Sequence, residues 1–330
     1  MLKGGVIGFG NMGQKLTGYI NGKPELGARV VAACNRGSAN LERAKSDFGL
    51  WVTRDINALL ERGLDFVLVL STSYAHADQV AKAAGAGCHI FCEKPIALNL
   101  EDADRMIAAV EQAGLVSVVN YGMRFNEAYL KIKQLVDAGE FGEVLAVTHA
   151  KIRGFGLYAS GARHRAVLEP GESGGWTVHH ACHDLDFLTW LLGPIQSVHA
   201  LTQSTTAVPG SEEIVLGMVL FRNGAIGSIA DSVCGIRDHY TLIIGTKASL
   251  VMTGEGADTR CRLQREGMPE PKLLPVQDSK RSGEGLDHFF ECIRSGTASP
   301  HSLRSARHSL AAALAMRESA RRGEPVRIED

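Results

Sequence analysis

Apolar and polar positions along the first 124 residues alternate in blocks typical of a strand-helix repeat. Short apolar runs stand at residues 4–9, 28–34, 64–71, 88–93 and 115–120. Segments with apolar residues at helical spacing follow the first four runs, at residues 12–20, 38–49, 74–87 and 99–114. Near-continuous apolar strands separated by such helices indicate a parallel sheet covered on both faces. The first half therefore predicts an α/β domain with a doubly wound parallel sheet.

The pattern changes after about residue 124. One further helical segment precedes runs with the alternation of half-buried strands, at residues 143–152, 195–204, 213–221, 225–233, 239–244 and 248–252. Asn223-Gly224 between two of these runs is a strong hairpin signal. The second half therefore predicts an α+β domain with a large, open, mostly antiparallel sheet, followed by two helices.

A chain of 330 residues is long enough for two packed cores. The patterns predict a first domain over residues 1–123 and a second over residues 124–330, with a last helix at about 303–321 that is able to pack back on the first domain. The second domain is expected to carry substrate and oligomer contacts. A wide open sheet often serves as an oligomer interface, so a homodimer or homotetramer through it is expected.

Charge and composition limit the classes of molecule that the protein is expected to bind. A formal net charge of -1 and a pI near 6.9 lack the basic footprint of a protein that binds nucleic acid or an anionic membrane, so the expected partner is a small molecule. The sequence shows no signal peptide and no apolar run long enough to span a membrane, which predicts a cytoplasmic location. Seven cysteines without a C-x-x-C pair favour reduced thiols in the core over a disulfide or zinc framework.

The stretch "GFGNMG" lies between the first predicted strand and the first predicted helix. Gly8, Gly10 and Gly13 have the G-x-G-x-x-G spacing of dinucleotide-binding loops. In that motif the first glycine permits the tight turn, the second lets a pyrophosphate approach the backbone, and the third lets helix and strand pack closely. The predicted loop contacts to the cofactor are Gly8, Phe9, Gly10, Asn11, Met12 and Gly13.

The end of the second strand reads "ACNRGS", where an acidic residue would hold the ribose hydroxyls of NAD. Asn35 stands there instead, and Arg36 and Ser38 follow. An arginine at this place suits the 2′-phosphate of NADP, so the sequence favours NADP while leaving NAD open. Arg36 as a solvated side chain stacked on the adenine is compatible with either cofactor.

Three further stretches, "STSYAHADQV", "CHIFCEKPIALN" and "GGWTVHHACHDLDFLTWLLG", follow the glycine motif in order. Together they resemble the glucose-fructose oxidoreductase, inositol dehydrogenase and rhizopine catabolism (Gfo/Idh/MocA) family over essentially the whole chain, with Glu93-Lys94-Pro95 as the most specific local mark. The resemblance implies a Rossmann domain that binds a nicotinamide cofactor, an α/β domain with an open sheet, and oxidation or reduction of a sugar, cyclitol or related polyol.

The resemblance also implies catalytic residues. Lys94 matches the lysine that family members place between the nicotinamide ribose and the substrate hydroxyl, and His183 matches the histidine of the family's D-x-x-x-H pattern, the usual proton acceptor. Removing hydride from an alcohol carbon requires removing the hydroxyl proton, which a histidine can take at neutral pH. Without the resemblance, Lys94 would be read as a surface lysine and His183 as a core residue.

Other positions match less securely. Thr72 and His76 match the loop that lines the cofactor in relatives, whereas Tyr74 stands where relatives often carry asparagine or proline. Arg124, near the change between domains, is a predicted substrate contact or a domain-packing residue. Besides the glycine loop, the predicted cofactor contacts are Asn35, Arg36, Ser38, Ser71, Thr72, His76, Glu93 and Lys94, and the predicted substrate contacts are Lys94, Arg124, His179 and His183.

The chain departs from the family pattern at His179, where D-x-x-x-H expects aspartate. If residues 175–191 are helical, His179 and His183 lie one turn apart on one face. The prediction is a metal-free site in which His179 hydrogen-bonds the substrate. The alternative is a metal held by both histidines with His164 or Glu169 as third ligand.

The sequence supports hypotheses for the function from three classes. The leading one is an NAD(P)-dependent dehydrogenase or reductase acting on CH–OH groups of sugars or polyols. The alternative is a lyase or glycoside-cleaving enzyme with a metal-assisted histidine site, which retains its nicotinamide and oxidises only transiently. A non-catalytic nucleotide sensor is the third, and the presence of both Lys94 and His183 counts against it.

Overall fold

The computed structural model describes residues 1–154, 169–205, 207–208, 210–276 and 283–329. The chain forms two compact units, one of residues Met1–Tyr121 and Arg281–Arg307, the other of residues Gly122–Lys280 and His308–Asp330. Below they are the first and the second unit. Across the part of the chain that the structure describes, no helix combines the length and the apolar character that a membrane span requires.

The first unit is built on a six-stranded parallel sheet with the strand order β3-β2-β1-β4-β5-β6. The strands are β1 Leu2–Ile7, β2 Ala28–Cys34, β3 Trp51–Thr53, β4 Phe66–Val69, β5 His89–Cys92 and β6 Ser117–Val119. This is the doubly wound order of a dinucleotide-binding domain, with the switch point between β1 and β4. The predicted parallel sheet is confirmed, although the three-residue β3 was not expected.

Helices of the first unit are α1 Asn11–Asn21, α2 Ser38–Ser46, α3 Ile56–Leu60, α4 His76–Gly85, α5 Leu100–Gln112 and α10 Glu284–Ser295, with 3-10 turns at η1 Pro24–Leu26 and η2 Ser73–Ala75. The α5 helix begins where the Asn99 side chain accepts a hydrogen bond from the Asp102 amide, a usual N-terminal cap. α10 comes from the distant carboxyl-terminal part and packs Phe289 and Phe290 edge-on against Phe66 of β4.

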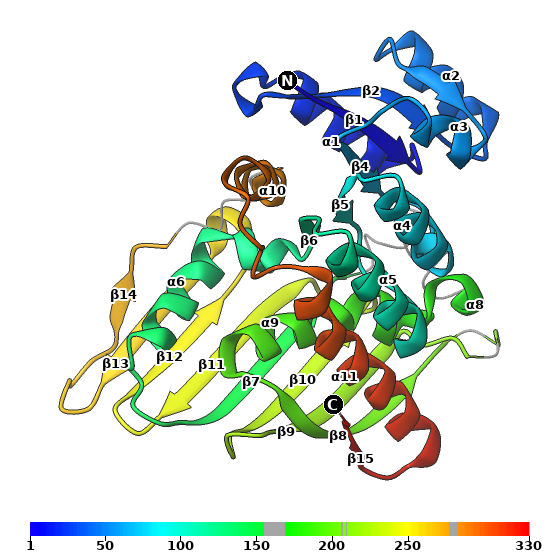
Figure 1. The fold of residues 1–330 in the computed structure, drawn as a ribbon. Coiled ribbons are helices and arrows are strands. Elements are labelled where there is room, and N and C mark those ends of the chain that lie inside the picture. Colours follow the sequence, from blue (N-terminus) through cyan, green and yellow to red (C-terminus); the bar gives the residue numbers. More distant parts are fainter. Residues whose placement is uncertain (155–168, 206, 209, 277–282, 330) are drawn as a thin grey trace. The chain divides into compact units, whose positions relative to one another are not determined.

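The second unit contains a nine-stranded sheet with the order β14-β13-β12-β11-β7-β10-β9-β8-β15 (Figure 1). Its strands are β7 Val144–Ile152, β8 Ile195–Gln203, β9 Ile214–Phe221, β10 Ile226–Ser232, β11 Asp238–Gly245, β12 Ala248–Thr253, β13 Arg260–Arg265, β14 Lys272–Leu274 and β15 Val326–Arg327. Only β7 and β10 pair in parallel within this sheet. The predicted open, mostly antiparallel sheet is therefore confirmed, and β13, β14 and β15 extend it.

Helices cover one face of this sheet (Figure 1). They are α6 Glu127–Asp137, α9 Cys182–Leu192 and the part of α11 Leu303–Arg322 that belongs to the second unit, with shorter turns at η3 Gly122–Phe125, α8 Pro170–Ser173 and η6 Gly256–Asp258. Met316 of α11 lies where a Cβ on Gly217 of β9 would stand 2.1 Å from its methyl group, so this glycine lets helix and sheet approach closely.

The predicted helix over residues 175–191 forms with one difference. Residues Thr177–Ala181 make a π-helical turn, η5, and the α-helix α9 begins at Cys182. A π turn widens the helix and shifts the residues that follow around its axis. The one-face arrangement expected of His179 and His183 assumed an uninterrupted α-helix, so that assumption is wrong.

Candidate active site

The glycine loop of the first unit has the backbone geometry that its spacing predicts. Gly8 has a φ of 94°, and a Cβ on it would stand 2.6 Å from the Ser71 amide nitrogen. A Cβ on Gly13 would stand 2.8 Å from the Gly8 carbonyl oxygen. Gly10 has open space around the same position, with no atom within 4 Å. The first and third glycines are thus required by the protein's own packing, while the second leaves room for a ligand.

The same loop leads into α1, whose N-terminal end suits an anion. Gly10 caps the helix without a side-chain hydrogen bond, and the first turn carries no acidic residue. Backbone N–H groups and the positive end of the helix dipole therefore lie beside the open space at Gly10. These residues fit the pyrophosphate of a dinucleotide.

Alanine substitutions at Gly10 and Gly13 should separate these two roles. Gly10→Ala is expected to leave the melting temperature unchanged and to weaken dinucleotide binding at least about tenfold, because the methyl group enters only the ligand's space. Gly13→Ala is expected to cost about 1–3 kcal/mol of stability through overpacking. Thermal unfolding and calorimetric titration of NAD and NADP measure both effects. Equal losses of stability in the two variants would contradict this assignment.

The end of β2 lacks an acidic group, as the sequence shows. The Asn35 side chain accepts a hydrogen bond from the Phe9 amide at 3.0 Å and donates to the Gly37 carbonyl at 3.1 Å, so it shapes the glycine loop from within the protein. Arg36 is exposed and donates from Nη1 to the Tyr74 hydroxyl at 2.6 Å. Ser38 begins α2. A cation and a second helix N-terminus therefore stand where the adenosine ribose is expected.

Loops at the carboxyl ends of β4 and β5 hold the remaining residues predicted in this unit. His76 is fully buried, with its ring nitrogens 3.0 Å from the Pro95 carbonyl oxygen and 3.2 Å from that of Ser71. It ties the loop after β4, which contains Thr72, to the segment after β5. Burial lowers the pKa of His76, which favours the neutral ring. Its position gives it a supporting role for both loops.

Lys94 follows Glu93, whose carboxylate is held by two hydrogen bonds. The Glu93 carboxylate accepts from the Asn120 side-chain amide at 2.6 Å and from the Lys94 backbone amide at 3.2 Å. Lys94 is half-buried, immediately beyond the carboxyl end of β5. In open α/β sheets, ligands bind at this edge of the strands.

In the second unit, three histidines lie on η5 and the start of α9. His179, His180 and His183 are each half-buried. The His180 ring stacks on Trp176 with centroids 4.0 Å apart, and the His179 and His180 centroids are 4.8 Å apart. His180 is therefore held by an aromatic neighbour within its own helix.

A buried polar network anchors this helix to the sheet. Asp184, next to His183, accepts from His149 Nε2 at 3.1 Å and from Arg153 at 3.2 Å. Arg153 also donates to Asp231 at 2.6 Å and to the His180 carbonyl at 3.2 Å. Trp176 Nε1 donates to Asp231 at 3.0 Å.

Burial dominates the titration of this network. It lowers the pKa of His149 to about 3, so the ring is neutral at physiological pH. Burial also raises the pKa of Asp231 to about 7 even though Arg153 opposes the shift. The nearby Asp184 carboxylate adds to that rise. These ionisable groups thus hold the π turn and the first residues of α9 in one arrangement.

Arg124 forms a buried ion pair with Asp186, separate from the network around Asp184. Its guanidinium donates from Nε and Nη2 to the two oxygens of Asp186 at 2.7 and 2.6 Å, and Ser309 of α11 donates to the same carboxylate at 2.8 Å. Arg124 is 4% exposed and Asp186 is fully buried. Burial raises the pKa of Asp186, and Arg124 opposes that rise. Asp186 therefore joins η3, α9 and α11.

Two models of one protein family match the two halves of the chain. A family model described as an oxidoreductase family with an NAD-binding Rossmann fold matches residues 2–121. The model of that family's C-terminal alpha/beta domain matches residues 133–328. The chain belongs to the Gfo/Idh/MocA oxidoreductase family. The family, fold class and enzyme class predicted from the sequence are confirmed.

Individual relatives of this Gfo/Idh/MocA oxidoreductase differ in reaction. 2,7-Anhydro-N-acetylneuraminate hydratase of Escherichia coli (strain K12) is 30% identical over 76% of this chain and 67% of its own length. scyllo-Inositol 2-dehydrogenase (NAD(+)) of Bacillus subtilis (strain 168) is 26% identical over 98% of this chain and 95% of its own. The crystal structure of the WlbA dehydrogenase from Bordetella pertussis, in complex with NADH and UDP-GlcNAcA, is 25% identical, has a TM-score of 0.84, and covers 100% of this chain and 99% of its own.

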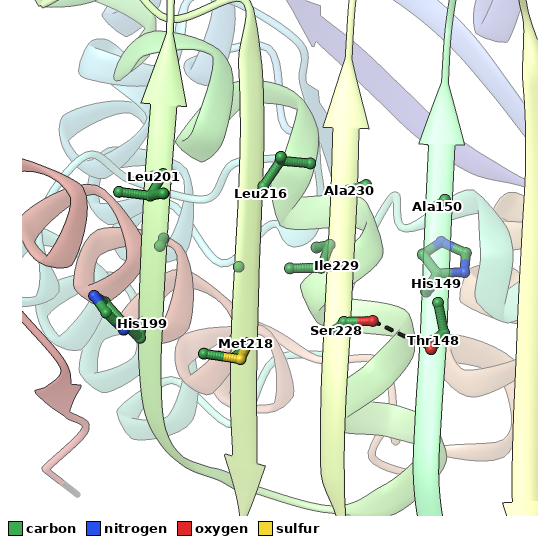
Figure 2. A pocket seen from close by; sticks show the side chains of 12 residues that line it. Thr148, His149, Ala150, His199, Leu201, Leu216, Met218, Ser228, Ile229 and Ala230 are labelled. Carbon is green, nitrogen blue, oxygen red and sulfur yellow. Dashed lines mark hydrogen bonds between the residues drawn. The ribbon is translucent and has the colours of Figure 1, made fainter.

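The sheet face opposite the helices carries an apolar hollow in this oxidoreductase. Figure 2 shows side chains of β7, β8, β9 and β10 around it, with the helices behind the sheet. The hollow measures about 380 Å³. Leu201, Leu216 and Met218 at its surface are 65%, 52% and 62% exposed.

Sequence reasoning about the site missed Arg153, Asp231 and Lys151, because each stands in or next to a strand without a local motif. The alternative to a metal-free site was a metal held by His179 and His183 with His164 or Glu169. Among the described residues, no three His, Cys, Asp or Glu side chains are grouped so that they could hold a metal ion. His164, one proposed third ligand, lies outside the described residues.

Proposed function

We propose that this Gfo/Idh/MocA oxidoreductase transfers hydride between a nicotinamide cofactor and a hydroxyl-bearing carbon of a sugar, cyclitol or related polyol. The observation that carries the proposal is the glycine loop, which has open space at Gly10 beside the start of α1. The proposal is supported further by Lys94 and His183, which match the residues that the family resemblance implies to be catalytic. The nicotinamide, when bound, supplies the site that accepts or donates the hydride.

Lys94 and His183 divide the proton chemistry in this proposal. The Lys94 ammonium donates a hydrogen bond to the reacting oxygen and stabilises the negative charge that develops there. His183 takes the hydroxyl proton during oxidation and returns it during reduction. Asp184, fixed by His149 and Arg153, keeps the backbone beside His183 in place.

His179 and Arg124 complete the proposed substrate contacts. His179 occupies the family's aspartate position and hydrogen-bonds a substrate hydroxyl, and no metal takes part. Arg124 contacts substrate from a guanidinium whose orientation Asp186 already sets.

We propose NADP as the preferred cofactor, supported by Arg36 and by the missing acid at the end of β2. Arg36→Asp is expected to shift the preference toward NAD, because the variant loses a phosphate partner and gains an acceptor for ribose hydroxyls. Titration of both cofactors measures the shift, with Arg54→Asp, an exposed arginine after β3, as the control. A preference for NAD in the unmodified protein would show that the reading of Arg36 is wrong.

A panel of sugars and polyols with NAD and NADP tests the proposed reaction. Net formation of reduced cofactor supports the dehydrogenase. The second candidate, a nicotinamide-retaining lyase, is favoured by the hydratase relative at 30% identity. Product formation without net cofactor reduction, from a protein that retains its nicotinamide, would favour that candidate instead.

We further propose that the apolar face of the large sheet joins copies of this chain into a homodimer or homotetramer. Leu216→Lys places a charge at the exposed hollow and is expected to yield monomers in sedimentation velocity. Ile236→Lys, at an 89% exposed position between β10 and β11, is the control and should leave assembly unchanged. A monomeric unmodified protein, or assembly that survives Leu216→Lys, would contradict this interface.

A further inference from the structure

Lys151 is a cation on the helix-covered face of the large sheet. It stands near the end of β7 and pairs with His239 of β11 in the sheet register. Side chains two residues apart on a strand share a face, so Lys151 lies on the same face as His149. His149 contacts Asp184, the residue after His183. The Lys151 side chain is half-buried beside the network that anchors α9.

The carboxylates around Lys151 are paired with other groups. Asp184 and Asp231 accept hydrogen bonds from Arg153. Glu255 accepts from Arg237 and lies 3.9 Å from His239 Nε2. Within the described ranges, the one hydrogen-bond contact of Lys151 Nζ is the Met123 sulfur at 4.0 Å, and no carboxylate oxygen comes within 4.0 Å.

A cation without a counterion in partly buried surroundings is costly to keep. Burial lowers the pKa of Lys151, and the charge of Arg153 lowers it further, while Asp184, Asp231 and Glu255 oppose the shift. An oxyanion at Nζ would supply a counterion that the described residues do not provide within 4.0 Å, and would form a charge-assisted hydrogen bond. Ionisable groups whose pKa values are strongly shifted concentrate at functional sites.

We propose that Lys151 binds an anionic group of the substrate, a carboxylate or a phosphate, so that the preferred substrates are acidic sugars rather than neutral polyols. This inference rests on the proposed function, because it places the anionic group on the sugar that the enzyme oxidises or reduces. Lys151 is then a specificity residue, separate from the proton chemistry of Lys94 and His183.

Calorimetric titration of the full-length protein, saturated with whichever of NAD and NADP binds more tightly, tests the inference. The probes are D-glucose, D-glucuronate and D-glucose 6-phosphate, and the same three forms of D-galactose. At least one acidic form is expected to bind at least about tenfold more tightly than its neutral parent, and Lys151→Gln is expected to remove that difference. The uronate and phosphate arms show which anion is preferred.

Lys272→Gln is the matched control, since it removes an exposed lysine from β14 of the same sheet and should keep the acid preference. Lys151→Met keeps the aliphatic length beside Met123 and gives the same test if the glutamine variant does not fold. Equal binding of acidic and neutral forms, no binding of any acidic form, or a preference that survives loss of Lys151 would overturn the inference. Binding is measured without turnover, so failure of the proposed hydride transfer is recognised separately.

Discussion

Replacing His183 or Lys94 with alanine is expected to lower kcat by at least about 100-fold, the usual scale for loss of a group that moves or stabilises a proton. Cofactor affinity should stay nearly unchanged, because most of the predicted cofactor contacts lie in the glycine loop and at the start of α1 rather than at these two side chains. Steady-state kinetics on the best substrate of the panel, together with calorimetric titration of the cofactor, measure both quantities.

Neighbouring residues of the same types provide the controls. His180→Gln changes an imidazole on the same helix that stacks on Trp176, and Lys82→Ala removes an exposed lysine of α4. Both should retain kcat within about threefold, a barrier change of less than 1 kcal/mol. Near-normal turnover in the His183 or the Lys94 variant would remove that residue from the mechanism.

Asp186→Ala is expected to cost about 3–5 kcal/mol of unfolding free energy, because it removes one partner of a buried, hydrogen-bonded ion pair with Arg124. Ser309 loses its acceptor in the same variant. Denaturant unfolding followed by circular dichroism measures the loss.

A partly exposed pair on α6 is the matched control for this prediction. Asp137→Ala breaks the i, i+4 pair with Lys133 on the surface and should cost at most about 0.5 kcal/mol. Replacing both buried partners, as Arg124→Met with Asp186→Leu, should recover much of the stability lost in Asp186→Ala. A loss below about 1 kcal/mol in Asp186→Ala would show that the buried pair does not hold these elements together.

Long periodic segments with local motifs could be predicted from the sequence. The glycine spacing marks the cofactor loop because three backbone requirements fall within six residues, and the structure shows a positive φ at Gly8 and a close approach at Gly13. β3 was not predicted because three residues are too few to establish a period. The π turn at Thr177–Ala181 was not predicted because its hydrogen-bond pattern leaves no mark in the order of apolar residues.

Long-range polar contacts could not be predicted from the sequence, for a different reason. Alternation along β7 shows that His149 and Lys151 share a face, but not that helix α9 covers it. Arg153 and Asp231 are 78 positions apart, and no local pattern joins them. The inference about Lys151 depends on knowing which carboxylates are already paired, which only the folded arrangement reveals.

Transfer of deuterium tests the central claim most directly. A polyol substrate labelled at its reacting carbon is incubated with the enzyme and the oxidised cofactor, and the cofactor is analysed by mass spectrometry. Hydride transfer predicts that deuterium appears in the reduced nicotinamide in proportion to the oxidised product, and that this transfer falls with Lys94→Ala and His183→Ala. Product formation in which deuterium is lost to water, with none passing to the nicotinamide, would contradict hydride transfer as the reaction of this enzyme.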